Sequence, residues 1–128
     1  MTHAIEAFLV PSFNPLCDAM ALEALKLISR FLPVAYNEPN NISARAGMLV
    51  GSCLAGVSFL KGLGLVHSIS HMIGAEYNTH HGLTNAIVLP VVLRFNLEGM
   101  DSQTATIAQN MHLEELSAAK LILSLIHI

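Results

Sequence analysis

Four of the seven histidines lie within residues 67–81, between apolar runs that carry almost no charge. They are His67, His71, His80 and His81. His67 and His71 are four residues apart, so a helix would project both rings from one face. Neutral imidazoles can be buried in an apolar setting and bind a divalent ion, which supplies the charge. Spacing alone leaves a second interpretation open, in which each is an isolated buried histidine bonded to a backbone carbonyl.

The composition is unusual for a domain that stands alone. The chain has 128 residues, which by length predicts one domain. Charged residues make up 12% and hydrophobic residues 53%, whereas about 25% charged residues is typical of soluble domains. The composition therefore indicates that this chain is an interior part of a larger protein. Its formal net charge of −3 gives no basic footprint, so we expect no nucleic-acid partner.

Cysteine content and hydropathy indicate the cellular compartment. Cys17 and Cys53 show no pairing pattern, which favours a reducing compartment over a disulfide scaffold. No basic segment precedes an apolar run at the start, so no secretory signal is visible. The longest uncharged central run, Ala46–Leu60, is shorter than the ~20 residues of a membrane span. We predict a buried helix there, no membrane partner and a cytoplasmic protein.

Helical periodicity without any long period-2 alternation predicts an all-α fold. The expected helices span about residues 2–10, 15–32, 42–61, 65–73, 82–96, 102–111 and 113–122. Asn14, followed by proline, is a good N-cap. Pro33 should end the second helix, and Pro90 should kink or end the fifth. Asp101 or Ser102 should cap the sixth.

Glycines mark the third predicted helix at Gly47, Gly51 and Gly56. Each costs up to about 1 kcal/mol of helix propensity. We therefore expect this helix to pack closely against neighbouring backbones.

The last six residues, 123–128, match what a common sequencing-library adapter spells when translated in frame. We treat them as a suspected adapter-derived tail. They are excluded from the fold prediction, together with His127.

Four blocks of sequence carry a family resemblance. They are Thr2–Ala7, Asn14–Ala19, Gly62–His71 and His81–Asn96. In this order and at this spacing, they resemble the iron-containing (group III) alcohol dehydrogenases. That family joins an N-terminal α/β domain that binds NAD(P) to an all-helical domain that holds the metal. The resemblance, which covers about residues 1–96, implies that residues 1–122 are a partial all-helical metal-binding domain of the dehydroquinate synthase-like architecture.

Carried over residue by residue, the resemblance implies that His3, His67 and His81 are metal ligands. It places His71 beside the metal as the catalytic residue, where it would relay a proton. This replaces the pairing of His67 with His71 that helical spacing suggests.

Three other polar residues are weaker candidates. We interpret His80 as an exposed neighbour of the ligands. Glu76 is the runner-up carboxylate ligand, although a solvated acid is the favoured interpretation. His112 lies where the resemblance is weak, and we expect it on the surface.

One departure from the family concerns its fourth ligand, an aspartate four residues before the first ligand histidine. Four residues before His3 lies upstream of Met1. We expect Met1 to be an internal methionine of a longer reading frame, which would also account for an uncapped first helix. Three neutral nitrogens without the carboxylate make a weaker site.

The resemblance implies a metal-dependent dehydrogenase that interconverts a small alcohol with an aldehyde or ketone. Its cofactors would be Fe(2+), with Zn(2+) possible, and NAD(P), bound mainly by the N-terminal domain, and the parent enzyme would be a homo-oligomer. Gly62-Leu-Gly64 is too short a match for a nucleotide-binding loop. Two alternatives stay open: a non-catalytic helical segment that binds only metal or partners, and an enzyme related to glycerol dehydrogenases.

Overall fold

The computed structural model describes residues 1–114 and 117–127, and within them the only regular elements are helices. They are α1 (Thr2–Leu9), α2 (Pro15–Asn37), α3 (Ile42–Ser58), the short 3-10 helix η1 (Phe59–Lys61), α4 (Leu65–Tyr77), α5 (His81–Asn96), α6 (Asp101–Asn110) and α7 (Ala118–His127). The prediction of an all-α fold is confirmed.

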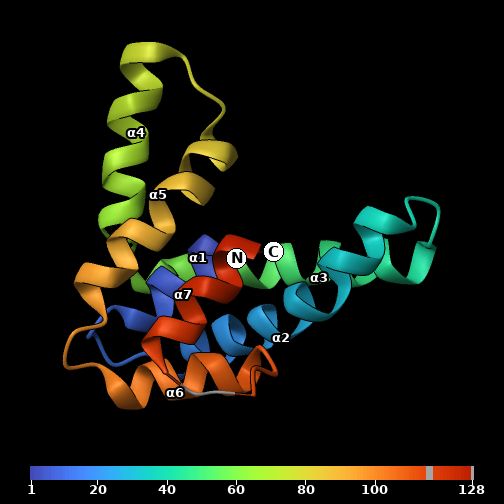
Figure 1. The fold of residues 1–128 in the computed structure, drawn as a ribbon, viewed down its shortest axis with the longest axis horizontal. Coiled ribbons are helices and arrows are strands. Elements are labelled where there is room, and N and C mark those ends of the chain that lie inside the picture. The colour runs from blue at the N-terminus through green and yellow to red at the C-terminus, as the bar shows by residue number, and fades with distance from the viewer. Residues whose placement is uncertain (115–116, 128) are drawn as a thin grey trace.

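Helix α1 is the centre of the arrangement. It packs against α2, α3, η1, α5 and α6, and its residues 4–7 are all buried. Two hairpins extend from this centre, one formed by α2 and α3 and the other by α4 and α5 (Figure 1). The largest fully buried side chains of the core come from six helices and include Ile5, Leu25, Val66, Leu93, Ile107 and Leu121. A short helix buried on all sides can hold its polar side chains in fixed positions.

The helix starts agree with the sequence at α2 but not at α6. The Asn14 side chain accepts a hydrogen bond of 3.2 Å from the Cys17 amide, as an N-cap should. At α6 the N-cap position is Met100, and no side chain caps the helix. Asp101 instead lies in the first turn, where its charge favours the positive end of the helix dipole. The predicted cap by Asp101 or Ser102 is therefore wrong.

Both prolines were predicted to interrupt helices, and both lie inside them. Helix α2 continues past Pro33 to Asn37, and the Glu38 amide still donates to the Val34 carbonyl at 2.8 Å. Pro33 lies near the end of the helix, so one lost amide donor disturbs few later bonds. Helix α5 likewise runs through Pro90 to Asn96. The prediction that Pro33 ends its helix is wrong. Pro90 does not end α5 either, and a kink at Pro90 stays a prediction.

Helix α4 is longer than predicted. Gly74 lies inside it, and the helix ends at Tyr77. The next residue, Asn78, has φ 50°. Asparagine tolerates this left-handed conformation, which closes a helix C-terminus. The stop signal was therefore Asn78 and not Gly74.

The glycines of α3 have different surroundings. A Cβ on Gly51 would lie 2.9 Å from the Ile28 side chain and 3.5 Å from the Ala24 carbonyl oxygen, so close packing on α2 is confirmed there. A Cβ on Gly47 would lie 2.2 Å from the ring of Phe31, so Gly47 makes room for a side chain. Gly56 has nothing within 4 Å, and the prediction of close packing is wrong at that position.

The segment Ile42–Lys61 is long and apolar enough to cross a membrane, with 20 residues and a hydropathy of 1.4. Length and composition alone are weak evidence, because core helices pass the same test. Only 22% of an 18-residue window within this segment is buried, so the prediction of a buried helix is not met by this chain alone. The exposed apolar side chains of this segment are Ile42, Leu49, Val50, Val57, Phe59 and Leu60.

The last described helix, α7, begins five residues later than predicted, at Ala118 in place of Leu113. Leu121 and Ile122 are buried in the core. Residues 123–127 continue the same helix, and residue 128 lies outside the described part of the chain. That residues 123–128 derive from an adapter stays a prediction.

Candidate metal centre

Four imidazole rings from three helices lie together. The ring centroids of His3 and His67 are 4.4 Å apart, and those of His67 and His81 are 5.4 Å apart. His71 lies 5.9 Å from His67 and 5.0 Å from His81. Two imidazoles that share an ion at ~2.1 Å have ring centres on the order of 5 Å apart. The rings are thus close enough to share one ion.

Three helices supply these rings. His3 is in the first turn of α1, His67 and His71 are one turn apart on α4, and His81 is the first residue of α5. His67 is buried, with 2% of its surface exposed. His71 and His81 lie on the open side of the cluster and are exposed. The assignment of ligand and relay roles to these four residues stays a prediction.

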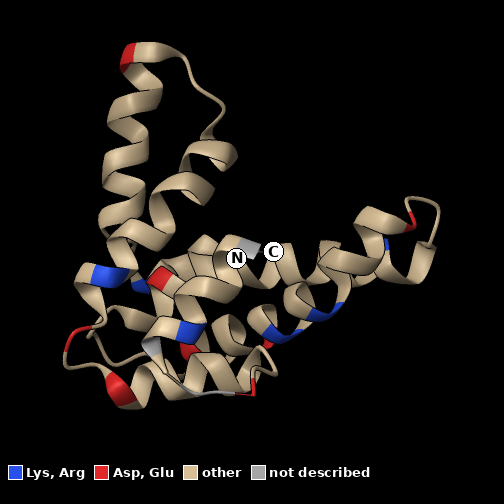
Figure 2. Ribbon diagram, viewed as in Figure 1, with Lys and Arg blue, Asp and Glu red and all other residues tan. Residues whose placement is uncertain are grey.

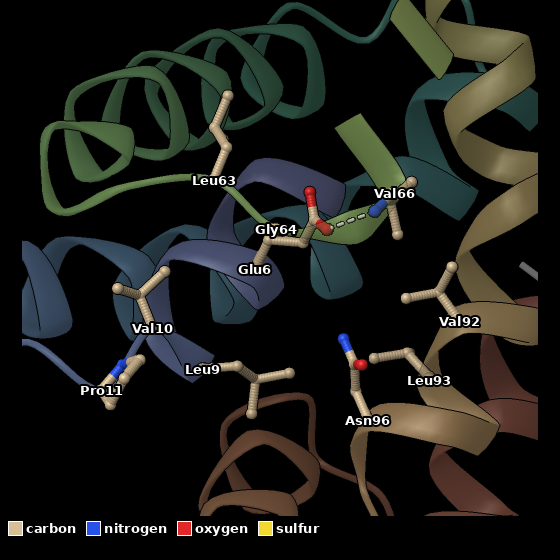
Figure 3. A pocket seen from close by; sticks show the side chains of 10 residues that line it. All are labelled: Glu6, Leu9, Val10, Pro11, Leu63, Gly64, Val66, Val92, Leu93 and Asn96. Carbon is tan, nitrogen blue, oxygen red and sulfur yellow. Dashed lines mark hydrogen bonds between the residues drawn. The ribbon is translucent and has the colours of Figure 1, made fainter. Parts of the chain in front are cut away.

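Glu6 is the residue of this site that the sequence interpretation missed. It is 4% exposed. One carboxylate oxygen accepts a hydrogen bond from Nδ1 of His67, and the other accepts one of 2.7 Å from the Val66 amide (Figure 3). An ionised carboxylate can only accept, so Nδ1 carries the proton and the lone pair is on Nε2. Glu6 thus fixes both the tautomer and the orientation of His67.

The two glycines before α4 make this contact possible. A Cβ on Gly64 would lie 2.6 Å from the carboxylate oxygen of Glu6 that bonds to Val66. Gly62 has φ 132°, a conformation that other residues rarely adopt. The Gly62-Leu-Gly64 sequence therefore has a structural role, to bring the start of α4 against α1.

Lys61 holds the other end of α1. Its side chain is 4% exposed and pairs with Asp18 of α2. Its ammonium group also donates a hydrogen bond of 3.2 Å to the Phe8 carbonyl. Because Lys61 directly precedes Gly62, this contact fixes the chain just before α4 begins.

Asn85 contacts two of the histidines. It is 5% exposed. Its Nδ2 lies 3.3 Å from Nε2 of His67 and 3.0 Å from Nε2 of His81. Its Oδ1 is buried without a hydrogen-bond partner. The amide N–H groups therefore occupy the nitrogens that would bind an ion.

The donor types suit a divalent metal, but their present orientation does not form a complete site. Among residues 1–114 and 117–127, no group of three His, Cys, Asp or Glu side chains is arranged to hold an ion. Two nitrogens, on His67 and His81, face the amide of Asn85. The imidazoles have the donor type that a divalent ion needs, and they lie close enough together to share one. They can surround an ion only if the Asn85 amide moves away from Nε2 of both His67 and His81.

The pKa values of two histidines favour neutral rings. Burial lowers the pKa of His3, and the neighbouring His67 lowers it further. The pKa of His81 is also lowered, first by loss of hydration and then by the nearby His67 and His71. Neutral imidazoles keep a free lone pair, which is the form that binds metal.

The weaker candidates lie outside the cluster. His80 is exposed, as expected, and its Nδ1 accepts a hydrogen bond of 3.2 Å from the Leu83 amide, which caps α5. Glu76 is exposed in the last turn of α4. Figure 2 shows that the α4–α5 hairpin carries few charged residues along its length. His112 is exposed, which confirms the surface prediction, and it adopts φ 56°.

Comparison with known proteins gives the family. The sequence profile of the Fe-containing alcohol dehydrogenase family, C-terminal part, matches residues 1–126. The chain belongs to the iron-containing alcohol dehydrogenase family. This confirms the resemblance seen in the four sequence blocks, and it extends the match beyond residue 96.

Relatives and solved structures agree with this family. The chain is 43% identical over 110 residues to NAD-dependent methanol dehydrogenase of Bacillus methanolicus, covering 85% of this chain and 29% of that protein. It is 41% identical over 112 residues to 1,3-propanediol dehydrogenase of Citrobacter freundii, with 87% and 29% covered.

A crystal structure of 1,3-propanediol oxidoreductase matches with a TM-score of 0.89 and 39% identity, covering 98% of this chain and 35% of that one. An alcohol dehydrogenase from Oenococcus oeni matches with a TM-score of 0.87 and 29% identity, covering 98% and 34%. The chain thus has the fold of the helical C-terminal region of iron-containing alcohol dehydrogenases. It spans about a third of the length of these relatives.

Proposed function

We propose that this chain provides the metal-binding helical part of an NAD(P)-linked alcohol dehydrogenase, with His3, His67 and His81 as ligands. The observation that carries the proposal is the convergence of these imidazoles, with a buried carboxylate, Glu6, fixing the orientation of His67. A histidine ligand whose second nitrogen donates to a carboxylate is the common arrangement at protein metal sites.

Imidazole ligands suit both Fe(2+) and Zn(2+), and the family of this chain favours iron. When bound, such an ion supplies a Lewis acid that lowers the pKa of an alcohol hydroxyl. Glu6 would keep the Nε2 lone pair of His67 directed at the ion. Val66 and Gly64 would in turn hold Glu6, through the amide bond and through the space left by the missing Cβ.

His71 is proposed to move the proton. Its ring lies beside those of His67 and His81, but it is exposed and has no hydrogen bond to Glu6 or Asn85 among the described contacts. A solvent-accessible imidazole next to the reacting hydroxyl can carry a proton to bulk water, because one ring nitrogen can accept a proton while the other donates one.

The substrate class we propose is a small primary alcohol or its aldehyde. Relatives named as methanol, 1,3-propanediol and butanol dehydrogenases support this choice. The names of these relatives include both NAD and NADPH as the nucleotide. We propose that the nucleotide is bound mainly by sequence outside this chain.

A second candidate function is a helical module that binds metal or a partner without catalysis. The observation in its favour is the large exposed apolar surface, which includes Phe13, Tyr36, Leu49, Phe95 and many smaller side chains. Such a surface is typical of an interaction site.

A chimera separates the two functions. Residues 1–122 would replace the matching third of 1,3-propanediol dehydrogenase, and the purified protein would be assayed for metal content and for oxidation of C1–C4 alcohols with NAD and NADP. We expect bound iron or zinc and alcohol-dependent reduction of the nucleotide. The same chimera with His67→Ala is the control and should lack both. A folded chimera that binds metal but oxidises no alcohol would contradict the catalytic proposal and favour the module.

A further inference from the structure

Asn85 has a geometry that neither packing nor helix capping explains. It comes one turn after His81 on α5, is 5% exposed, and directs Nδ2 at the Nε2 atoms of both His67 and His81. Its Oδ1 is buried with no partner. Burying a carbonyl oxygen without a partner is unfavourable, so the contacts of the Nδ2 group must offset that cost.

The orientation of the amide follows from the lone pairs that it faces. Glu6 holds the proton of His67 on Nδ1, so Nε2 of His67 presents a lone pair. A carbonyl oxygen in the place of Nδ2 would oppose that lone pair. The amide nitrogen, with two N–H groups, can serve both imidazoles at once.

Each neutral imidazole has one nitrogen with a lone pair, and that nitrogen has one partner at a time. Hydrogen bonding to Asn85 and coordination of an ion therefore exclude each other at Nε2 of His67. The contact with Nε2 of His81 is 3.0 Å and puts the same amide at the second ligand.

We propose, on the basis of the proposed metal centre, that Asn85 is a placeholder for the ion. Its amide holds the Nε2 atoms of His67 and His81 until an ion displaces it. A half-turn about the Cβ–Cγ bond would exchange Nδ2 with Oδ1 and so remove the competing N–H groups from both imidazoles. Asn85 thus positions the ligands and also competes with the metal for them.

Two substitutions test this role in opposite chemical ways. Asn85→Ala removes the competing N–H groups, and Asn85→Asp replaces them with an acceptor that can face a cation. Asn85→Ala removes two hydrogen bonds of ordinary strength with which the Asn85 amide competes for the imidazole nitrogens. We therefore expect Asn85→Ala to bind Zn(2+) about tenfold more tightly. Asn85→Asp should bind more tightly still, because it adds a charged oxygen ligand.

The measurement is the Zn(2+) dissociation constant of the purified chain, from competition with a chromophoric chelator at neutral pH. Co(2+) absorption would report the coordination number. Asn96→Ala is the matched control, since Asn96 is on the same helix, lines a pocket between α1 and α5, and makes no described contact with a histidine (Figure 3). Its Zn(2+) affinity should equal that of the wild type. Asn85→Asp keeps the shape of the side chain, so it tests the role even if Asn85→Ala does not fold.

The outcomes are distinct. Tighter Zn(2+) binding by the Asn85 variants supports the placeholder role. Weaker binding by both, with the wild type and the Asn96→Ala control binding equally, overturns it and leaves the proposed metal centre standing. No uptake of Zn(2+) by the wild type or by any variant overturns the metal centre and the role of Asn85 together.

Discussion

The surroundings of His67 and the outer face of α3 differ in how many of their side chains find partners within this chain. Around His67, both ring nitrogens and both oxygens of Glu6 have partners from this chain. On α3 and the following η1, apolar side chains such as Leu49, 73% exposed, and Leu60, 75% exposed, have no cover. The hydrogen bonds of His67 and Glu6 are complete within the chain, although Oδ1 of Asn85 has no partner. The apolar side chains of the outer face are left uncovered.

This difference suggests which properties the chain has by itself. Hydrogen bonds at His67 depend on α1, α4 and α5 alone, so the orientation of the ligand needs no partner. The exposed face of α3 buries its apolar area only against another surface. We therefore expect the metal ligands to be arranged in the isolated chain, and solubility to be its weakest property.

The largest effects should come from removing single imidazoles of the site. In the chimera, His67→Ala should abolish metal binding and turnover. His71→Ala should keep the metal, and turnover should fall by about 10²–10⁴-fold, as expected for a lost acid–base group. Metal analysis of the purified variants decides between the two roles. Loss of metal in His71→Ala, with metal retained in His81→Ala, would mean that the i,i+4 pair is the true ligand set.

The next largest effect should come from the carboxylate that holds His67. Glu6→Gln removes its charge, and we expect metal affinity to fall by about 10–100-fold. Glu6→Ala should also cost about 1–3 kcal/mol of stability for each buried N–H donor that it leaves unpaired, on His67 and on Val66. Denaturant titration and metal competition measure the two effects.

Glu23→Ala is the matched control, since Glu23 is half exposed and pairs only with Lys26. It should change stability by less than about 1 kcal/mol. Equal losses in the Glu6 and Glu23 variants would contradict the role of Glu6.

Two glycine substitutions test whether Glu6 depends on the space beside Gly64. Gly64→Ala places a Cβ where a Glu6 oxygen now lies and should cost about 1–3 kcal/mol by breaking the bond to the Val66 amide. Gly56→Ala has open space and should stabilise α3 by about 0.5–1 kcal/mol. Thermal unfolding of the two variants should therefore shift in opposite directions. A stabilising Gly64→Ala would show that Glu6 does not need its present position.

The smallest effect on stability should come from substitutions on the exposed apolar face of α3 and η1. Val50→Lys combined with Leu60→Glu should change the free energy of unfolding by less than about 0.5 kcal/mol per site. The same change should reduce self-association, because it divides the exposed apolar surface. Light scattering after size-exclusion chromatography measures the mass in solution. A wild-type chain that stays monomeric at high concentration would contradict the prediction of association.

The sequence predicted the parts of this structure that depend on local pattern. Helical periodicity located α1 to α6, whereas half of α7 lies in residues 123–127, which the prediction excluded. The spacing of His67 and His71 put both rings on one side of α4. The helix ends at Pro33 and Gly74 were misplaced, since local preferences for ending a helix were outweighed by the surrounding structure.

Glu6 and Asn85 were missed for a different reason. Glu6 meets His67 across 61 residues of sequence, and Asn85 meets it across 18, so no local pattern records either contact. A weak signal existed. Glu6 is the only acid in the apolar helix α1, and Asn85 follows His81 at helical spacing. Only the tertiary arrangement of α1, α4 and α5 shows that these two side chains reach one imidazole.

The bond between Glu6 and His67 also has a consequence for folding kinetics. The α2–α3 and α4–α5 hairpins form from neighbouring segments, whereas α1 reaches His67 only by closing a loop of 61 residues. Closing so long a loop costs entropy that local contacts do not incur. We expect both hairpins to form first and the ligand cluster to assemble last, when α1 docks. Amides of α1 should then gain protection from hydrogen exchange later than those of α2 during refolding.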